Sequence, residues 1–287
     1  MPALVDEGVF EATWAVVESQ VTVAAAALLM HGMFLLTFVL ALFLLLRNHT
    51  PAQRVLLFTA IILAMFAIVQ VSLDAALVSV ISSVLQIQMK EGMTERVVGL
   101  LDAFSTIYDV RLGAFAINNV IADGLFLYRC SMIWSSSRYA PVIVAIPLLL
   151  ILTNTAIGFA AIYLVLDIRI PFAFALLTNL VLFGLTAGRI WNKRRAAAAL
   201  LGITAHRRYT TTLEVVLESS LLYAICDILY ISSITKSVPP FGAFQNICWG
   251  SLAQLVNILP MMIVVRVALA RTPPPASTVS TSYKEVV

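Results

Sequence analysis

Seven long apolar stretches, separated by polar connections, dominate the pattern of hydrophobic and polar positions along this chain. Each stretch exceeds the ~20 residues that a helix needs to cross ~30 Å of hydrocarbon. A transmembrane β-barrel would instead show alternating patterns over strands of only ~10 residues. We therefore predict an all-α, polytopic membrane protein with seven transmembrane helices, at residues 21–46, 55–80, 111–134, 140–166, 170–191, 211–235 and 243–270.

Composition supports the same class of protein. Of the 287 residues, 61% are hydrophobic and 11% are charged, whereas soluble domains carry about 25% charged residues. A soluble fold of this size cannot hide so much apolar surface, so we expect the lipid bilayer to be the principal partner. The predicted location is an integral, multi-pass one in the plasma membrane or an endomembrane, and a nucleic acid partner is not expected.

Basic residues fall mainly on alternate connections between the apolar stretches. Thirteen of the 18 Lys and Arg residues lie on one side of the predicted membrane and five on the other. Because cytoplasmic loops carry the excess of Lys and Arg, this asymmetry predicts an outside N-terminus and a cytoplasmic C-terminus. Residues 1–20 then form an extracellular or lumenal segment, 21–271 the transmembrane bundle, and 272–287 a disordered cytoplasmic tail.

Two connections are more informative than the rest. The outer connection 81–110 is long, and it carries one approximate apolar stripe that predicts a short amphipathic helix on the outer face. The cytoplasmic connection 192–210 is rich in Lys and Arg. It is either a topology determinant beside anionic lipid or a docking surface for a cytoplasmic protein partner. The residues of the outer stripe are Val97, Val98, Leu101, Phe104 and Ile107.

Polar side chains at membrane depth are the main functional signal. Asp123 lies about 18 Å into the third span, near the midplane, and Asn119 shares its helical face one turn earlier. A charge at this depth is costly, so it faces the bundle interior and has either a partner or a task. Such a layer is either interhelical polar packing or a hydrated cavity that admits a small-molecule ligand or an ion. The candidates are Asn118, Asn119, Asp123, Asn154, Asn179, Asp227, Gln254 and Asn257.

A second polar group lies at the predicted cytoplasmic end. Arg129 closes the third span, and Glu214 and Glu218 open the sixth, one turn apart on one helical face. An ion pair between Arg129 and either carboxylate would tie the third helix to the sixth. In a receptor such a tie is a bistable element that ligand binding can bias, whereas in any other protein it is a static strut.

The sequence lacks the residues that several kinds of chemistry require. None of the four lysines lies deep in a span, which excludes the Schiff base of a retinal protein. The three histidines are scattered without metal-ligand spacing, and a phosphate-binding glycine loop and a nucleophile elbow are both missing. We therefore expect no cofactor and no metal site, assign no catalytic residue, and regard an enzyme as the less favoured class.

Four motifs resemble a known group of proteins. They are the runs DGLFLYRCSMIW at 123–134, TNLVLFGLTAGRIW at 178–191, ESSLLY at 218–223 and PMMIVVRVALAR at 260–271. In sequence and order they resemble the seven-helix integral membrane proteins of mushroom-forming basidiomycete fungi, and the similarity extends from about residue 20 to 271. This resemblance implies a seven-helix fold and carries over no catalytic residue. Asn257 departs from it, since the group is expected to have glycine there.

Three functions remain open from the sequence. A receptor-like sensor of unknown ligand is favoured by the helix count, the outside N-terminus and the basic connection 192–210. A transporter of small solutes or ions would use Asp123 and Asp227, although the chain shows no internal repeat. An intramembrane enzyme acting on a lipid or isoprenoid would need a second carboxylate beside one of these two.

Overall fold

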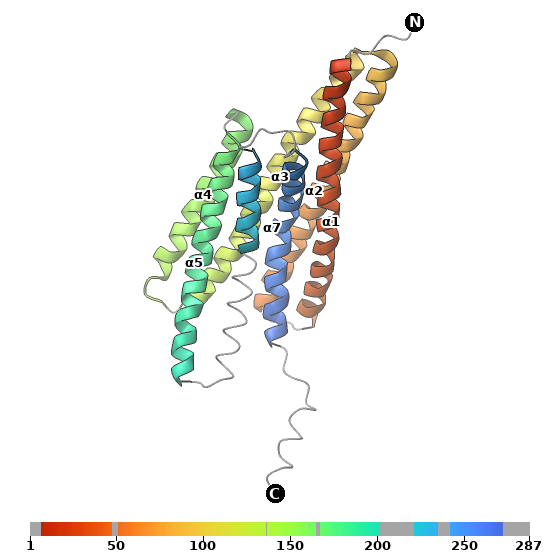
Figure 1. The fold of residues 1–287 in the computed structure, drawn as a ribbon. Helices are drawn as coiled ribbons and strands as arrows, with labels where there is room; N and C mark the ends of the chain where they lie inside the picture. The colour runs from red at the N-terminus through yellow and green to blue at the C-terminus, as the bar shows by residue number, and fades with distance from the viewer. Residues whose placement is uncertain are drawn as a thin grey trace.

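Long α-helices account for nearly all of the chain that the computed structural model describes, namely residues 7–47, 51–135, 137–164, 167–200, 221–234 and 242–271. Within these ranges no strand occurs. A shorter helical segment, Leu221–Ile234, precedes the last helix. The long helices are α1 (Glu7–Leu46), α2 (Pro51–Glu91), α3 (Glu95–Trp134), α4 (Ala140–Leu164), α5 (Arg169–Leu200) and α7 (Gly242–Arg271) (Figure 1).

Five helices, α1 to α5, are long and apolar enough among the described residues to cross a membrane. Their outward faces carry large apolar side chains. Leu29, Leu36 and Phe58, for example, are 67%, 74% and 66% exposed. Water-soluble monomers rarely expose apolar surface on this scale, because its contact with water is unfavourable. These helices confirm the prediction of an all-α, multi-pass membrane protein.

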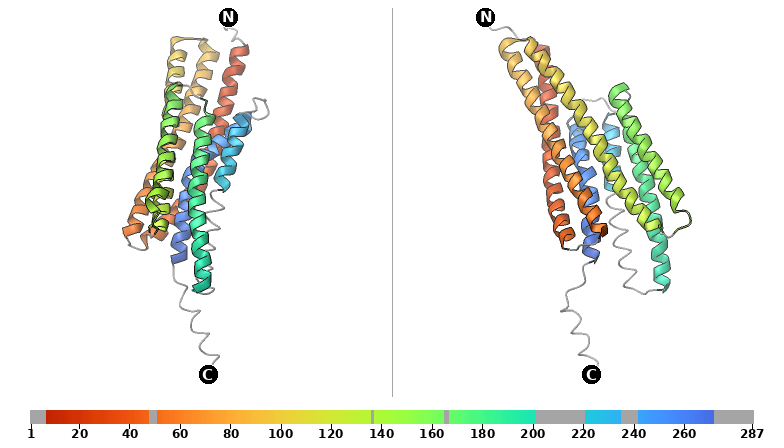
Figure 2. Two further views of the ribbon diagram at one scale, coloured as in Figure 1. Left: turned by 90° about the vertical axis from the view of Figure 1, so that its left-hand side faces the viewer. Right: turned by 180° about the vertical axis from the view of Figure 1, so that it is seen from behind.

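The bundle has two ends. We call the end at which α1 begins and α2 finishes the upper end, and the end at which α1 finishes the lower end (Figure 1). Helices α1 to α5 alternate in direction, since short connections return each helix antiparallel to the one before it (Figure 2). α7 again begins at the upper end, so it runs parallel to α1, against which it packs extensively.

The connection between α2 and α3 is much shorter than the sequence predicted. Only residues 92–94 join the two helices. Gly92 has a φ of 75°, which glycine tolerates, and its N–H donates to the carbonyl oxygen of Gln88 at 3.1 Å. The prediction of a separate short helix inside an 81–110 connection is therefore wrong. Residues 81–91 continue α2, and residues 95–110 open α3.

The upper ends of α1, α2 and α3 reach beyond the other helices (Figure 2). A 40-residue helix such as α1 or α3 is about 60 Å long, twice the ~30 Å thickness of the hydrocarbon core. This upper extension has an apolar core of its own. On the predicted stripe Val97 is buried, whereas Val98 is 53% exposed. The buried residues of this core are Val17, Ile81, Val84 and Val97.

α7 lies at the centre of the bundle. Its side chains from Cys248 to Met261 are all buried, and the helix packs against α1, α2 and α3. Gly250 sets its distance from α1, because an added Cβ would lie 2.4 Å from the carbonyl oxygen of Val23. A close helix contact through small residues is typical of membrane bundles, and here it fixes the position of α7.

Candidate functional site

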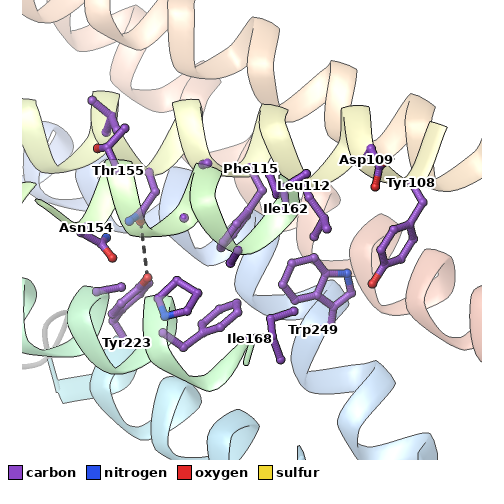
Figure 3. A pocket seen from close by; sticks show the side chains of 18 residues that line it. Tyr108, Asp109, Leu112, Phe115, Asn154, Thr155, Ile162, Ile168, Tyr223 and Trp249 are labelled. Atoms are coloured by element: carbon purple, nitrogen blue, oxygen red, sulfur yellow. Dashed lines mark hydrogen bonds between the residues drawn. The ribbon is translucent and has the colours of Figure 1, made fainter. Parts of the chain in front are cut away.

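A cavity of about 280 Å³ opens in the upper half of the bundle, between α3, α4, α5, the segment Leu221–Ile234 and α7. We call it the upper cavity (Figure 3). Its middle is lined by apolar side chains, while polar groups gather toward its two ends. The apolar residues of the middle include Leu112, Phe115, Ile162, Ile168 and Phe172.

The inner end of the upper cavity carries neutral hydrogen-bonding groups. The hydroxyl of Tyr223 donates a long hydrogen bond of 3.5 Å to Oδ1 of Asn119 (Figure 3). Asn154 and Thr155 of α4 line the same end. The Oδ1 atom of Asn154 is buried and has no hydrogen-bond partner among the described residues. An unsatisfied acceptor beside a cavity is a group that a ligand donor or a water can satisfy.

The other end is aromatic and carries the exposed carboxylate of Asp109. Trp249 of α7 lies at the centre of an aromatic cluster there, with its ring centroid 5.2 Å from that of Phe115 and 5.8 Å from that of Phe172. Tyr230 completes the cluster, 4.7 Å from Phe172 and 5.5 Å from Trp249. Such offset and edge-on ring contacts hold this wall of the cavity rigid.

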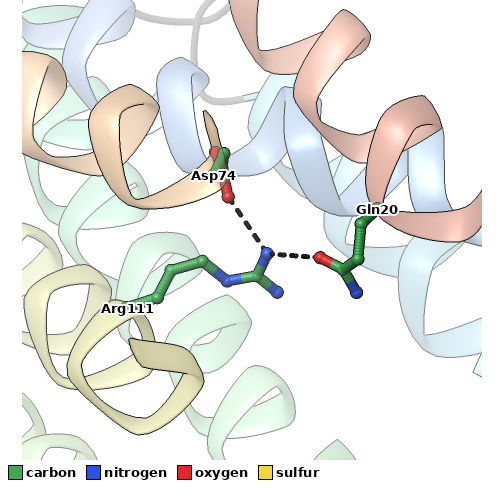
Figure 4. Close-up of polar contacts among 3 residues, drawn as sticks. All are labelled: Gln20, Asp74 and Arg111. Atoms are coloured by element: carbon green, nitrogen blue, oxygen red, sulfur yellow. Dashed lines mark hydrogen bonds and ion pairs between the residues drawn. The ribbon is translucent and has the colours of Figure 1, made fainter. Parts of the chain in front are cut away.

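Behind this aromatic wall, a buried ion pair joins α3 to α2, and a hydrogen bond joins the same arginine to α1. Nη1 of Arg111, on α3, contacts Oδ1 of Asp74, on α2, at 3.0 Å, and both side chains are 3% exposed. The same nitrogen donates to Oε1 of Gln20, on α1, at 3.4 Å (Figure 4). The guanidinium also lies 5.4 Å from the ring centroid of Trp249 and 4.9 Å from that of Tyr108, both of which line the upper cavity. This ion pair therefore braces the aromatic wall against α1 and α2.

A second, much smaller cavity lies below the first. It has a volume of about 10 Å³, which is enough for about one water molecule. We call it the lower cavity. Asn119 and Tyr223 line both cavities, while Asp123 and Asn179 line only the lower one. Its remaining walls are apolar side chains of α3 and α7, namely Ala122, Phe126, Val256 and Leu259.

Asp227 follows Tyr223 by one helical turn on the segment Leu221–Ile234, and it is not among the residues that line either cavity. Its side chain is fully buried, and neither carboxyl oxygen has a hydrogen-bond partner among the described residues. Its carboxyl lies within electrostatic reach of Asp123, and both interact electrostatically with Tyr223. The structure thus brings together two acidic residues that are 104 positions apart in sequence.

The structure divides the predicted midplane residues into separate groups. Asn119, Asn154, Asp123 and Asn179 line one or both cavities. Gln254 instead faces α1 and α2, with its Oε1 3.3 Å from Nδ1 of His31 and its Nε2 donating to the carbonyl oxygen of Ala67 at 3.4 Å. The remaining two, Asn118 and Asn257, are buried and line neither cavity, and Asn257 donates to the carbonyl oxygen of Ala253 at 3.3 Å.

At the lower end, the predicted tie between Arg129 and the sixth span is untested, since Glu214 and Glu218 lie outside the described residues. Arg129 is half-buried on α3. The contact described there joins α3 to α5, because Nε1 of Trp134 donates to the carbonyl oxygen of Leu185 at 3.1 Å. Arg189 lies over the same indole ring, 4.7 Å from its centroid. α5 continues into the predicted connection 192–210 as far as Leu200, and residues 201–210 lie outside the described part.

Sequence reasoning missed the ion pair between Asp74 and Arg111. Neither residue was among the predicted candidates. A usable signal was present, since each is a single charge near the outer end of neighbouring apolar stretches, and the two charges are opposite. The aromatic cluster around Trp249 was missed as well, because aromatic residues in apolar stretches carry little positional information.

Among the described residues, no three His, Cys, Asp or Glu side chains form a cluster that could hold a metal ion through those groups alone. The chemistry available at the two cavities is therefore that of carboxyl, amide and phenol oxygens beside aromatic and aliphatic surface. In comparisons with known proteins, no family model, no curated protein and no solved structure matches this chain, and the resemblance to the fungal seven-helix group stays a prediction.

Proposed function

We propose that this protein is a receptor-like membrane sensor that binds a small, mainly apolar molecule in the upper cavity. The observation that carries the proposal is the cavity itself, about 280 Å³ of space between helices of the bundle. Ligand sites are typically apolar cavities of ~300–1,000 Å³ with a few placed polar groups, so this volume fits a ligand at the small end of the range.

The lining suggests the chemistry of this ligand. An apolar, partly aromatic body would lie against Phe115, Phe172 and Ile162. At the inner end, the unpartnered Oδ1 of Asn154 can accept a hydrogen bond from a ligand hydroxyl or N–H. We therefore propose an apolar molecule with one donor group at its inner end.

We further propose seven transmembrane helices, as the resemblance to the fungal seven-helix group implies, with the N-terminus outside and the C-terminus in the cytoplasm. The parallel course of α1, α5 and α7 supports the odd count, because one upward span between α5 and α7 is then required. Leu221–Ile234 supports that span: Tyr223 contacts Asn119, whereas Tyr230 contacts Phe172, nearer the upper end. Positive charge on the lower half of α5 supports a cytoplasmic lower end.

The shape of the cavities favours a sensor over a carrier. The upper cavity has a volume of about 280 Å³, whereas the lower cavity, which Tyr223 also lines, has a volume of only about 10 Å³. A ligand that fills the upper cavity is thus held beside Tyr223 and Asn119, which also line the lower cavity. Ligand binding can therefore bias the packing of α3 against the segment Leu221–Ile234, which is the kind of change a receptor needs.

The test compares two glycine substitutions that add the same side chain. Gly158 lines the upper cavity, and a Cβ added there meets no atom within 4 Å, so Gly158→Phe fills the cavity without a backbone clash. Gly184 is equally open but lies on the exposed face of α5, so Gly184→Phe is the matched control. Small molecules that remain bound during purification from membranes are measured for each protein by native mass spectrometry.

We expect the wild type and Gly184→Phe to retain the same small molecule, and Gly158→Phe to lose at least ~90% of it because its site is filled. Equal retention by all three proteins would show that the upper cavity is not the binding site. If the retained molecule then crosses proteoliposome membranes in a protein-dependent way, the protein is a transporter rather than a sensor.

A further inference from the structure

We propose that Asp123 and Asp227, together with the amide and phenol oxygens of the lower cavity, bind one sodium ion between α3 and the segment Leu221–Ile234. The site lies below the upper cavity, with which it shares Asn119 and Tyr223, and it does not require the proposed ligand. Its evidence is a water-sized space lined by the buried carboxyl of Asp123, with the buried carboxyl of Asp227 within electrostatic reach and no cationic side chain paired to either among the described residues.

Burial is the first part of the argument. Asp123 is 2% exposed and Asp227 is fully buried, so neither carboxyl has access to bulk water. Both oxygens of Asp227 are without a hydrogen-bond partner in the described residues. Unpartnered carboxyls at this depth are unfavourable, because the surrounding protein and lipid solvate a negative charge poorly. A bound cation supplies the missing partner.

The contrast with Asp74 strengthens this argument. Asp74 is buried to the same degree as Asp123, yet it has Arg111 at 3.0 Å as its counter-charge. Among the described residues, the bundle therefore provides a fixed cation for Asp74 and none for Asp123 or Asp227. An exchangeable cation is the simplest counter-charge for the unpaired site.

The donor atoms fit a hard monovalent ion. Sodium, like other hard cations, prefers oxygen donors, and the polar residues around the lower cavity offer them. Asn179 donates its amide nitrogen to the carbonyl oxygen of Ala175 at 3.1 Å, which leaves Oδ1 as the atom available to an ion. Asn119 and Tyr223 supply a further amide oxygen and a phenol oxygen. A volume of about 10 Å³ admits a single ion of this size.

Sodium binding has a consequence for the upper cavity. Asn119 and Tyr223 line both cavities and are joined by a hydrogen bond of 3.5 Å. An ion that binds either oxygen changes that hydrogen bond. Sodium binding in the lower cavity is therefore coupled to ligand binding in the upper cavity. By thermodynamic reciprocity, the upper-cavity ligand then changes sodium affinity by the same factor.

The experiment needs no ligand. The thermal midpoint Tm of the purified, detergent-solubilised protein is measured in 150 mM NaCl and in 150 mM choline chloride, so that ionic strength is constant. Choline is too large for a cavity of about 10 Å³. If sodium is present at roughly ten times its Kd, the wild-type Tm rises by roughly 3 °C in NaCl. Asp227→Asn removes one carboxyl and should abolish the difference, whereas Asp102→Asn, at an exposed carboxyl that lines neither cavity, should retain it.

A wild-type Tm that is the same in both salts overturns the proposal, whatever the variants do. A salt difference that survives in Asp227→Asn also overturns it, since the ion must then bind elsewhere. Should Asp227→Asn fail to fold, Asn179→Leu is the second variant, and it too must lose the sodium response. A Tm that follows pH but not sodium would show that the two carboxyls share a proton instead.

Discussion

Buried polar groups are arranged differently on the two sides of this bundle. On the side where α7 packs against α1 and α2, the buried charges are paired, with Arg111 held between Asp74 and Gln20. On the side where α3, α4 and α5 meet the segment Leu221–Ile234, the structure has a cavity of about 280 Å³ and the buried Asp227, whose carboxyl has no hydrogen-bond partner in the described part of the chain. The first arrangement is that of a scaffold, and the second is that of a binding site.

This difference shows that burial alone does not identify a functional residue in a membrane bundle. Asp74 and Asp123 are almost equally buried, yet only Asp123 borders empty space. Polar groups with partners hold helices together, whereas polar groups that face a cavity without partners can take a ligand or an ion. The predictions below test this division, beginning with the largest expected effect.

Arg111→Leu should have the largest effect on stability. Removing the guanidinium leaves Asp74 buried without a counter-charge and removes the contact with Trp249, so the free energy of unfolding should fall by about 3–5 kcal/mol. Arg169→Leu is the matched control. Its ion pair with Asp167 is 3.5 Å long and about half exposed, so the loss should stay below about 1 kcal/mol. Both values come from denaturant titrations in detergent, followed by helical circular dichroism.

Gly250→Ala should have the next largest effect. The added Cβ would lie 2.4 Å from the carbonyl oxygen of Val23, so α7 must move away from α1 at a cost of about 1–3 kcal/mol. Gly184→Ala adds the same atom where nothing lies within 4 Å, and it should stabilise the helix by about 0.5–1 kcal/mol. The same titration measures both variants. If both substitutions changed the free energy of unfolding by the same amount, the close contact between α1 and α7 would be contradicted.

Asp227→Asn should change stability little in sodium-free buffer. The carboxyl has no described partner to lose, so the free energy of unfolding should change by less than about 1 kcal/mol. Asp74→Asn makes the same chemical change on the paired side and should cost about 3 kcal/mol, since Arg111 is left uncompensated. A loss for Asp227→Asn as large as that for Asp74→Asn would mean that both carboxyls are paired, and the division between the two sides would fail.

Tyr223→Phe should have the smallest effect. The lost hydroxyl makes one long hydrogen bond of 3.5 Å to Asn119, which contributes less than about 1 kcal/mol to stability. Because that hydroxyl borders both cavities, the variant should nevertheless weaken the sodium-dependent rise in Tm. A thermal melt in NaCl and in choline chloride measures both quantities. An undiminished sodium response would show that this oxygen takes no part in the site.

The sequence predicted the membrane bundle because apolar stretches report directly on burial in lipid. It also predicted Asn119, Asp123 and Asn154 as members of a polar layer, since a polar residue at membrane depth must face the interior. The upper extension was not predicted. A mixed polar and apolar stretch such as 81–110 was interpreted as a connection with a short helix of its own when only membrane crossing was considered, although Val84 and Val97 have partners on neighbouring helices.

The division of the polar layer could not be predicted either. Gln254 and Asp123 are both polar residues at middle depth, and the sequence gives no sign that Gln254 faces His31 on α1 while Asp123 faces a cavity. Which face of a helix meets which neighbour depends on the packing of the whole bundle. Gly250 illustrates this point, because its role follows from the position of Val23, more than 200 residues earlier in the chain.

The central claim is that the upper cavity is a binding site, and an experimental structure of the protein in lipid nanodiscs tests it most directly. The wild type is compared with Gly158→Phe under the same conditions. We predict compact non-protein density in the wild type, in contact with Asn154 and Tyr223, and no such density in the variant. A cavity closed by side chains, or filled by a lipid chain that enters from the bilayer in both proteins, would contradict the account.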